Sequence, residues 1–374
     1  MDKKQVVRGL KFLVILALAG CTSQPAKESP QAQATKGSRE AKPTVLYQSN
    51  RLGSLEPCGC DSKPFGGMDR EWNAAQMIRG EGQPVVFVDA GNALAPSNKK
   101  GPLKHHQEKA KTIVGLMNEL GVDAFAPGPA DYGLGLEALA GLKAASRFLW
   151  VSTNVLKGGT PVFSPYVVVE RNGLRIGVLS ASPFGAIKEA GVTPVEPKTA
   201  IEQLLPEVTA KSDVVVLLSQ LATASDSDLA PKLAGVHVVV GSDTKSAFEE
   251  PLWFTARNIE VDPHINGYYL GRLNLDLRLP FEGLFSPAAV TKNRNELAEW
   301  KAQLVKDPSN TFAKRSVEFL EKTACLAPIE GGSNYTNELI PLDPKRFGKK
   351  NALTALLTQE KERVRQRAIR EASE

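Results

Sequence analysis

Residues 44–70, TVLYQSNRLGSLEPCGCDSKPFGGMDR, combine the features of half a βαβ unit. The apolar run at 45–47 predicts a strand, and a polar segment follows it at 48–50. The Gly66-Gly67 turn then leads into a helix expected over 69–79. Because open α/β sheets bind their ligands where the strands end, we expect a functional site in the polar segment.

Downstream, short apolar runs alternate with amphipathic stretches as far as residue 279. This alternation, together with the Asn172-Gly173 hairpin signal, predicts mixed sheets covered by helices in a domain over 44–280. Strands are expected at 85–88, 148–152, 166–170, 175–179, 214–219, 236–241 and 267–279, and helices at 109–120 and 199–210. After Pro280, the pattern predicts helices at 293–306, 311–323 and 351–373 and an extended segment at 335–343, which we interpret as a short helical C-terminal extension over 281–374.

The N-terminus has the pattern of an export signal. A basic start precedes an apolar core at 12–19, which is too short to span a bilayer, so 1–20 is predicted to be a signal peptide. LAGC at 18–21 resembles the bacterial lipobox, and this resemblance implies a lipoprotein with acyl chains such as palmitate on Cys21. Residues 21–43 lack apolar periodicity and are expected to form a disordered tether. The predicted location is the lipid-anchored cell envelope, and Thr22 favours the outer membrane if the host has one.

Charge limits the kinds of partner. The chain has 374 residues and a formal net charge of +5, of which the first twenty residues account for +3. The remaining +2 argues against a nucleic-acid partner bound through phosphate charge. The membrane and an unidentified envelope protein or small ligand are therefore the expected partners.

Three further thiols, Cys58, Cys60 and Cys325, follow the tether. In an exported protein paired cysteines usually form disulfides, and a bridge between Cys58 and Cys60 would close a strained ring. A bridge from one of them to Cys325 is easier and leaves an odd thiol. A three-thiolate metal or haem-related site and a reactive redox pair remain as alternatives, so thiol-based redox or metal handling is one candidate function.

The first stretch and several later motifs together resemble the 5′-nucleotidase-like branch of the calcineurin-type metallophosphoesterases. The later motifs are VDAGN (88–92), GVDAFAPG (121–128), DYG (131–133), NGLRIGV (172–178), DVVVLLS (213–219), VVVG (238–241), EP (250–251) and GYYLGR (267–272). The resemblance implies a metallophosphoesterase-like αββα sandwich, in which two mixed sheets are flanked by helices and a dinuclear metal site lies at the strand ends. LEPCGC at 55–60 is similar to a subset of exported members.

The positions that this resemblance assigns to the metal site have changed. They hold Asn50, Leu52, Asn92, Pro129, Ala130, Gln220, Asp243 and Lys245. Family members carry aspartate, asparagine and histidine ligands at these motifs, whereas this chain has no histidine at any of them. We expect the histidines of the chain to be solvent or loop residues; they are His105, His106, His237 and His264.

These changes predict a degenerate site. Leu52 and Ala130 offer no ligand atom, and neutral amides bind divalent ions weakly without several carboxylates. We therefore expect no catalytic residue and no cofactor beyond a single weakly bound divalent metal. The leading hypothesis is a non-catalytic binding or scaffold protein of the envelope. The alternatives are a phosphoesterase or 5′-nucleotidase with an altered metal site and the thiol-based function.

Overall fold

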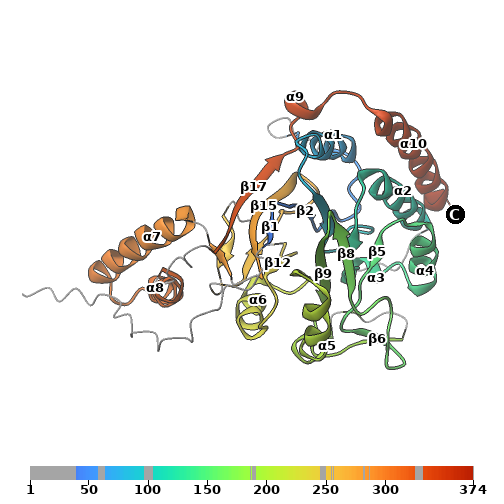
Figure 1. Ribbon diagram of the computed structural model, residues 1–374. Helices are drawn as coiled ribbons and strands as arrows, with labels where there is room; N and C mark the ends of the chain where they lie inside the picture. Colours follow the sequence, from blue (N-terminus) through green and yellow to red (C-terminus); the bar gives the residue numbers. More distant parts are fainter. Residues whose placement is uncertain are drawn as a thin grey trace, which may run out of the picture. The chain divides into compact units, whose positions relative to one another are not determined.

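Two mixed β-sheets form the centre of the computed structural model (Figure 1). The structure describes residues 39–57, 64–96, 104–185, 187, 191–244, 250–253, 255, 257–280, 283–285, 287–324 and 332–373. The chain from Ser38 to Glu374 forms one compact unit. Predictions for Cys21, Cys58, Cys60, Lys245 and Cys325 lie outside the described residues.

The first sheet has the strand order β16-β17-β15-β2-β3-β4-β5, and β1 also pairs with β15. The strands from β2 to β5 are parallel, whereas β15 runs antiparallel to β2 and β17. The bounds are β1 Arg39–Ala41, β2 Thr44–Gln48, β3 Val85–Asp89, β4 Ala124–Phe125, β5 Leu149–Trp150, β15 Tyr269–Leu279, β16 Leu284–Phe285 and β17 Ser333–Pro341.

The second sheet has the order β13-β14-β12-β11-β9-β8, in which the four central strands are parallel. Its strands are β8 Val167–Arg171, β9 Leu174–Ala181, β11 Val214–Ser219, β12 Val238–Val240, β13 Leu252–Trp253 and β14 Ile259–Val261. A small sheet adds β6 Val155–Lys157, β7 Thr160–Pro161 and β10 Val192–Pro194.

Apolar side chains from both sheets form the core between them. Val45 and Val88 of the first sheet belong to the same buried cluster as Val178 and Val216 of the second. Every residue of β2 is buried, as expected for a strand that is covered on both faces. Two apolar layers facing each other thus account for the sandwich.

Helices cover the outer faces of the two sheets (Figure 1). Leu46 and Phe87 of the first sheet pack in a cluster with residues of α1 and α2, and Val215 and Leu217 of the second pack with residues of α5. The helices are α1 Met68–Arg79, α2 Lys104–Leu120, α3 Pro129–Tyr132, α4 Leu136–Ala145, α5 Pro197–Lys211, α6 Thr223–Leu229, the 3-10 helix Ala230–Lys232, α7 Pro287–Lys306, α8 Thr311–Ala324, α9 Pro344–Phe347 and α10 Ala352–Ser373. The predicted αββα architecture is confirmed.

The expected domain limits differ from the structure at both ends. β17 pairs with β15 inside the first sheet, and α10 packs against α2, so 281–374 is not a separate helical extension. Ile340 of β17 is fully buried in the core, which explains why the chain returns to the sheet. Residues 39–41, assigned to the tether, form β1. No helix in the described part of the chain is both long and apolar enough to cross a bilayer.

Candidate functional site

The polar positions expected at the strand ends lie in four loops. Asn50 follows β2 and Asn92 follows β3 of the first sheet, while Gln220 follows β11 and Asp243 follows β12 of the second. Hydrogen bonds join Asn50 directly to Asn92, and both Asn50 and Gln220 reach across to the opposite sheet. The structure therefore brings loops of both sheets together at one place.

A chain of amide hydrogen bonds connects Asn50 and Asn92. The Nδ2 atom of Asn92 donates to Oδ1 of Asn50 at 3.0 Å, and Nδ2 of Asn50 donates to the carbonyl oxygen of Ser242 at 2.7 Å. The Oδ1 atom of Asn92 accepts from the backbone N–H of Ala130 at 3.0 Å. Both ends of each amide are thus engaged within the protein.

Gln220 makes a second connection between the sheets. Its Nε2 atom donates to the carbonyl oxygens of Ala90 at 2.8 Å and Ala126 at 3.3 Å, both in the first sheet's loops. Its Oε1 atom accepts from the hydroxyl of Ser182 at 2.6 Å. We call the side chains of Asn50, Asn92 and Gln220 with these partners the amide network. Because an unsatisfied buried polar group costs about 1–3 kcal/mol, the network stabilises the junction of the sheets.

The backbone at this junction is unusual. Asn50, Leu52 and Asn92 have φ values of 48°, 52° and 52°, in the left-handed region. Asparagine tolerates this conformation, whereas leucine does so at a cost of order 1–3 kcal/mol. The N–H of Leu52 donates to the carbonyl oxygen of Asn92 at 2.8 Å, so the neighbouring loop holds the strained residue in place.

A glycine makes the close approach of the third loop possible. A Cβ atom on Gly128 would lie 2.3 Å from Oδ1 of Asn92. Pro129 and Ala130 follow at the start of α3, and both are partly exposed, as is Leu52. These three side chains present carbon rather than a ligand atom at their assigned positions.

A buried ionic group beneath the amide network was not predicted from the sequence. Nη1 and Nη2 of Arg51, a residue that is 1% exposed, contact the two carboxylate oxygens of Glu71 at 2.6 and 3.1 Å. Nη2 also lies 3.8 Å from Oδ2 of Asp89. Burial raises the pKa of Asp89 to about 6, although Arg51 and the N–H of Gly91 oppose the shift. The signal for Glu71 was its helical spacing from the buried Met68 and Ala75.

Four acidic residues form a second group, which we call the carboxylate cluster: Asp226, Asp243, Glu260 and Asp262. Of these, the sequence analysis identified only Asp243 as a site residue. Oδ1 of Asp226 accepts from the hydroxyl of Ser219 at 2.8 Å, and Oδ2 of Asp262 accepts from the N–H of Asp243 at 3.2 Å. Burial, reinforced by the neighbouring carboxylates, raises the pKa of Glu260 well above its usual range. Burial likewise raises the pKa of Asp262 to about 8. Glu260 is the middle residue of β14 and Asp262 directly follows the strand, and a strand pattern alone does not reveal that they meet Asp243.

These donors do not fit a dinuclear metal centre. Within the described ranges, no group of three or more histidine, cysteine, aspartate or glutamate side chains is arranged to hold a metal ion. The amide network uses the oxygen atoms of Asn50, Asn92 and Gln220 internally, and Asp89 faces Arg51. Two ions about 3.5–4 Å apart need bridging and terminal ligands, which this arrangement does not supply.

The histidines differ in part from the expectation. His237 precedes β12 and is partly buried, and its Nδ1 accepts the backbone N–H of Val215 at 2.9 Å. Burial lowers its pKa to about 4. His237 is thus a loop residue, as expected, but its imidazole is bonded to the backbone. His105 and His106 lie on α2 rather than in a loop, and His264 is a partly exposed loop residue.

Comparison with solved structures defines the class of fold. A 5′-nucleotidase precursor from Thermus thermophilus superposes with a TM-score of 0.63 and 20% identity, covering 88% of this chain and 59% of that one. A calcineurin-like phosphoesterase from Bacillus subtilis has a TM-score of 0.62 and 14% identity, covering 90% of this chain and 100% of that one. The fold is that of the calcineurin-like phosphoesterases.

Sequence comparison with known proteins finds relatives that are called 5′-nucleotidases. The 5′-nucleotidase of Rattus norvegicus is 27% identical over 225 residues, which cover 54% of this chain and 38% of the relative. A probable 5′-nucleotidase of Treponema pallidum is 26% identical over 182 residues, covering 45% of this chain and 29% of the relative. The chain thus spans less than half the length of these relatives, and no family model matches it. The predicted resemblance to the 5′-nucleotidase branch of the calcineurin-type superfamily is confirmed.

Proposed function

We propose that this chain is a non-catalytic binding or scaffold protein of the cell envelope, built on a 5′-nucleotidase-like domain. The amide network is the observation that carries the proposal. At positions that the resemblance assigns to metal ligands, this network has neutral amide side chains, and these are hydrogen-bonded to one another and to the backbone. These side chains also connect the two sheets at their junction through direct hydrogen bonds.

Energetic considerations support this proposal. A metal at Asn50 or Asn92 would have to compete with the donors that already bind their oxygens, Asn92 Nδ2 and the N–H of Ala130. The resemblance places Asn92 where family members carry a bridging aspartate. Two cations would lack that carboxylate here, so their mutual repulsion would go uncompensated. The resemblance places Ala130 where family members carry a histidine that stabilises the transition state. The loss of one such well-placed donor typically costs about 2.7–4 kcal/mol.

A phosphoesterase or 5′-nucleotidase with an altered metal site is the second candidate. The curated relatives are called 5′-nucleotidases, and this supports the hydrolase equally well at the level of the family. The thiol-based function remains a hypothesis about Cys58, Cys60 and Cys325. A free-thiol count before and after reduction tests it, since an unchanged count of three would exclude a disulfide among them.

An activity assay separates the two main candidates. We expect the purified protein to show no metal-dependent turnover of bis-aryl phosphates or nucleotides when manganese, zinc or calcium is supplied. The wild type is compared with Asp243→Ala, at the assigned site, and with Asp276→Ala, which is on β15 and paired with Lys42. Turnover that saturates with metal, disappears in Asp243→Ala and persists in Asp276→Ala would establish the hydrolase.

The lipid anchor is a separate part of the proposal. It is supported by LAGC at 18–21 and the short apolar core before it. Because buried acyl chains contribute roughly 0.8 kcal/mol per methylene, two or more chains would hold the protein firmly at the membrane. We expect Cys21→Ser to accumulate unprocessed or to be released from the membrane fraction. Normal processing and retention of this variant in fractionated cells would contradict the lipid anchor.

A further inference from the structure

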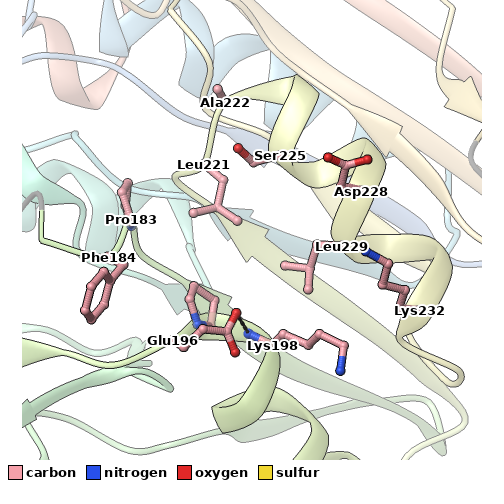
Figure 2. A pocket seen from close by; sticks show the side chains of 11 residues that line it. Pro183, Phe184, Glu196, Lys198, Leu221, Ala222, Ser225, Asp228, Leu229 and Lys232 are labelled. Atoms are coloured by element: carbon pink, nitrogen blue, oxygen red, sulfur yellow. Dashed lines mark hydrogen bonds between the residues drawn. The ribbon is translucent and has the colours of Figure 1, made fainter.

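A pocket of about 810 Å³ lies at the carboxyl ends of β9 and β11. Figure 2 shows the residues that line it. Pro183 directly follows Ser182, and Leu221 directly follows Gln220, the two residues that share a hydrogen bond in the amide network. Its volume falls within the usual range of small-molecule sites. None of the described residues that line this pocket belongs to the assigned metal positions.

The pocket has an apolar middle and an exposed aromatic ring. Leu221 and Leu229 lie between Phe184 on one side and Lys232 on the opposite side (Figure 2). Phe184 is 73% exposed and lines the pocket. A ligand with an apolar side chain would cover this ring and remove its surface from water.

Two opposite charges on the same wall have no partner in the described residues. Asp228 and Lys232 are four residues apart, yet no ion pair joins them, and neither side chain forms a hydrogen bond with a described residue. The other charges at the rim are already engaged. Glu196 caps α5 by accepting from the N–H groups of Lys198 and Thr199, and Nζ of Lys198 binds Glu202 at 2.7 Å. Among the described lining residues, the charges available to a ligand are therefore one ammonium and one carboxylate.

We propose that this pocket binds a free α-amino acid with a large apolar side chain. The carboxylate of the ligand would face Lys232, its ammonium would face Asp228, and its side chain would pack on Phe184 and Leu221. Opposite charges presented together match a zwitterion better than an anion or a cation. An anion would be repelled by Asp228, and a cation would be repelled by Lys232. The proposal deepens the proposed binding role and does not depend on whether the assigned metal site is empty.

Calorimetric titration of the purified protein tests the proposal with four probes. L-phenylalanine carries all three features, whereas 3-phenylpropionate lacks the ammonium, phenethylamine lacks the carboxylate and L-alanine lacks the ring. We expect L-phenylalanine to bind at least about threefold more tightly than each of the other three, since an exposed ion pair contributes modestly. Equal affinity for phenylpropionate or phenethylamine, or no saturable binding of L-phenylalanine, would overturn the proposal.

Matched variants locate the binding. Phe184→Ala, Asp228→Asn and Lys232→Met are each expected to weaken L-phenylalanine binding about threefold or more. Phe312→Ala on α8 and Lys143→Met on α4 change exposed residues of the same types elsewhere and should leave L-phenylalanine binding unchanged. Because all five positions are exposed, unfolding temperatures should be retained. Unaltered binding in Phe184→Ala and Lys232→Met would place the amino acid elsewhere and refute this site. Failure here would leave the metal and activity measurements unaffected.

Discussion

Replacing Arg51 with methionine should lower the free energy of unfolding by about 3–5 kcal/mol, because it leaves a buried carboxylate without its cation. Arg51 is bonded through two nitrogens to Glu71, and it also faces Asp89. All three side chains are almost completely buried. Methionine fills much of the volume but supplies neither charge nor donors, so Glu71 loses both of its hydrogen bonds to the guanidinium.

Urea unfolding followed by circular dichroism measures this loss. Arg147→Met is the matched control, since Arg147 pairs with Glu119 at the surface, and such a pair typically contributes less than about 1 kcal/mol. The double variant Arg51→Met/Glu71→Met should recover part of the stability, because it removes the orphaned charge as well. A loss in Arg51→Met no larger than that in Arg147→Met would show that the ionic group is not buried as described.

Glu260→Gln should stabilise the protein at pH 8 by about 2 kcal/mol and should flatten the dependence of its stability on pH. Burial and the adjacent Asp226, Asp262 and Asp243 raise the pKa of Glu260 above its value in the unfolded chain. The folded state therefore holds more protons than the unfolded state at pH values between the unfolded pKa, about 4.5, and the raised folded pKa. Stability is greatest below the unfolded pKa and falls as the pH rises toward the folded pKa.

Thermal unfolding between pH 5 and pH 9 tests this dependence. The wild type should unfold at a lower temperature at pH 9 than at pH 5, and Glu260→Gln should show a smaller difference. Glu137→Gln, at an exposed position of α4, should retain the wild-type dependence. A wild-type stability that rises over this range would contradict the assignment of raised pKa values to the carboxylate cluster.

Much of the sandwich could be predicted because its strands are continuous apolar runs. The strand expected at 214–219 is found as Val214–Ser219. The strand expected at 85–88 is found as Val85–Asp89, which is one residue longer. An extended segment was expected near β17, but its place in the first sheet was harder to predict. β17 lacks a continuous apolar run, and its partner β15 is more than fifty residues away in the chain. β1 has three residues in a polar segment, and only its pairing with β15 identifies it.

The assigned site could be predicted in part. Motif positions located Asn50, Asn92 and Gln220 at strand ends, but not the amide bonds between them, which depend on the approach of two sheets. Arg51 occupies a position between two motif residues and gave no sign of its partner Glu71. The carboxylate cluster needed the tertiary fold, because β14 lies beside β12 only after the second sheet has formed.

Metal content of the purified protein is the most direct test of the claim that the amide network replaces the metal centre. The protein is equilibrated with manganese and zinc, dialysed and analysed by plasma mass spectrometry beside Asp243→Ala. We predict well under one ion per chain, with no difference between wild type and variant. Two retained ions per wild-type chain, lost in Asp243→Ala, would contradict the claim.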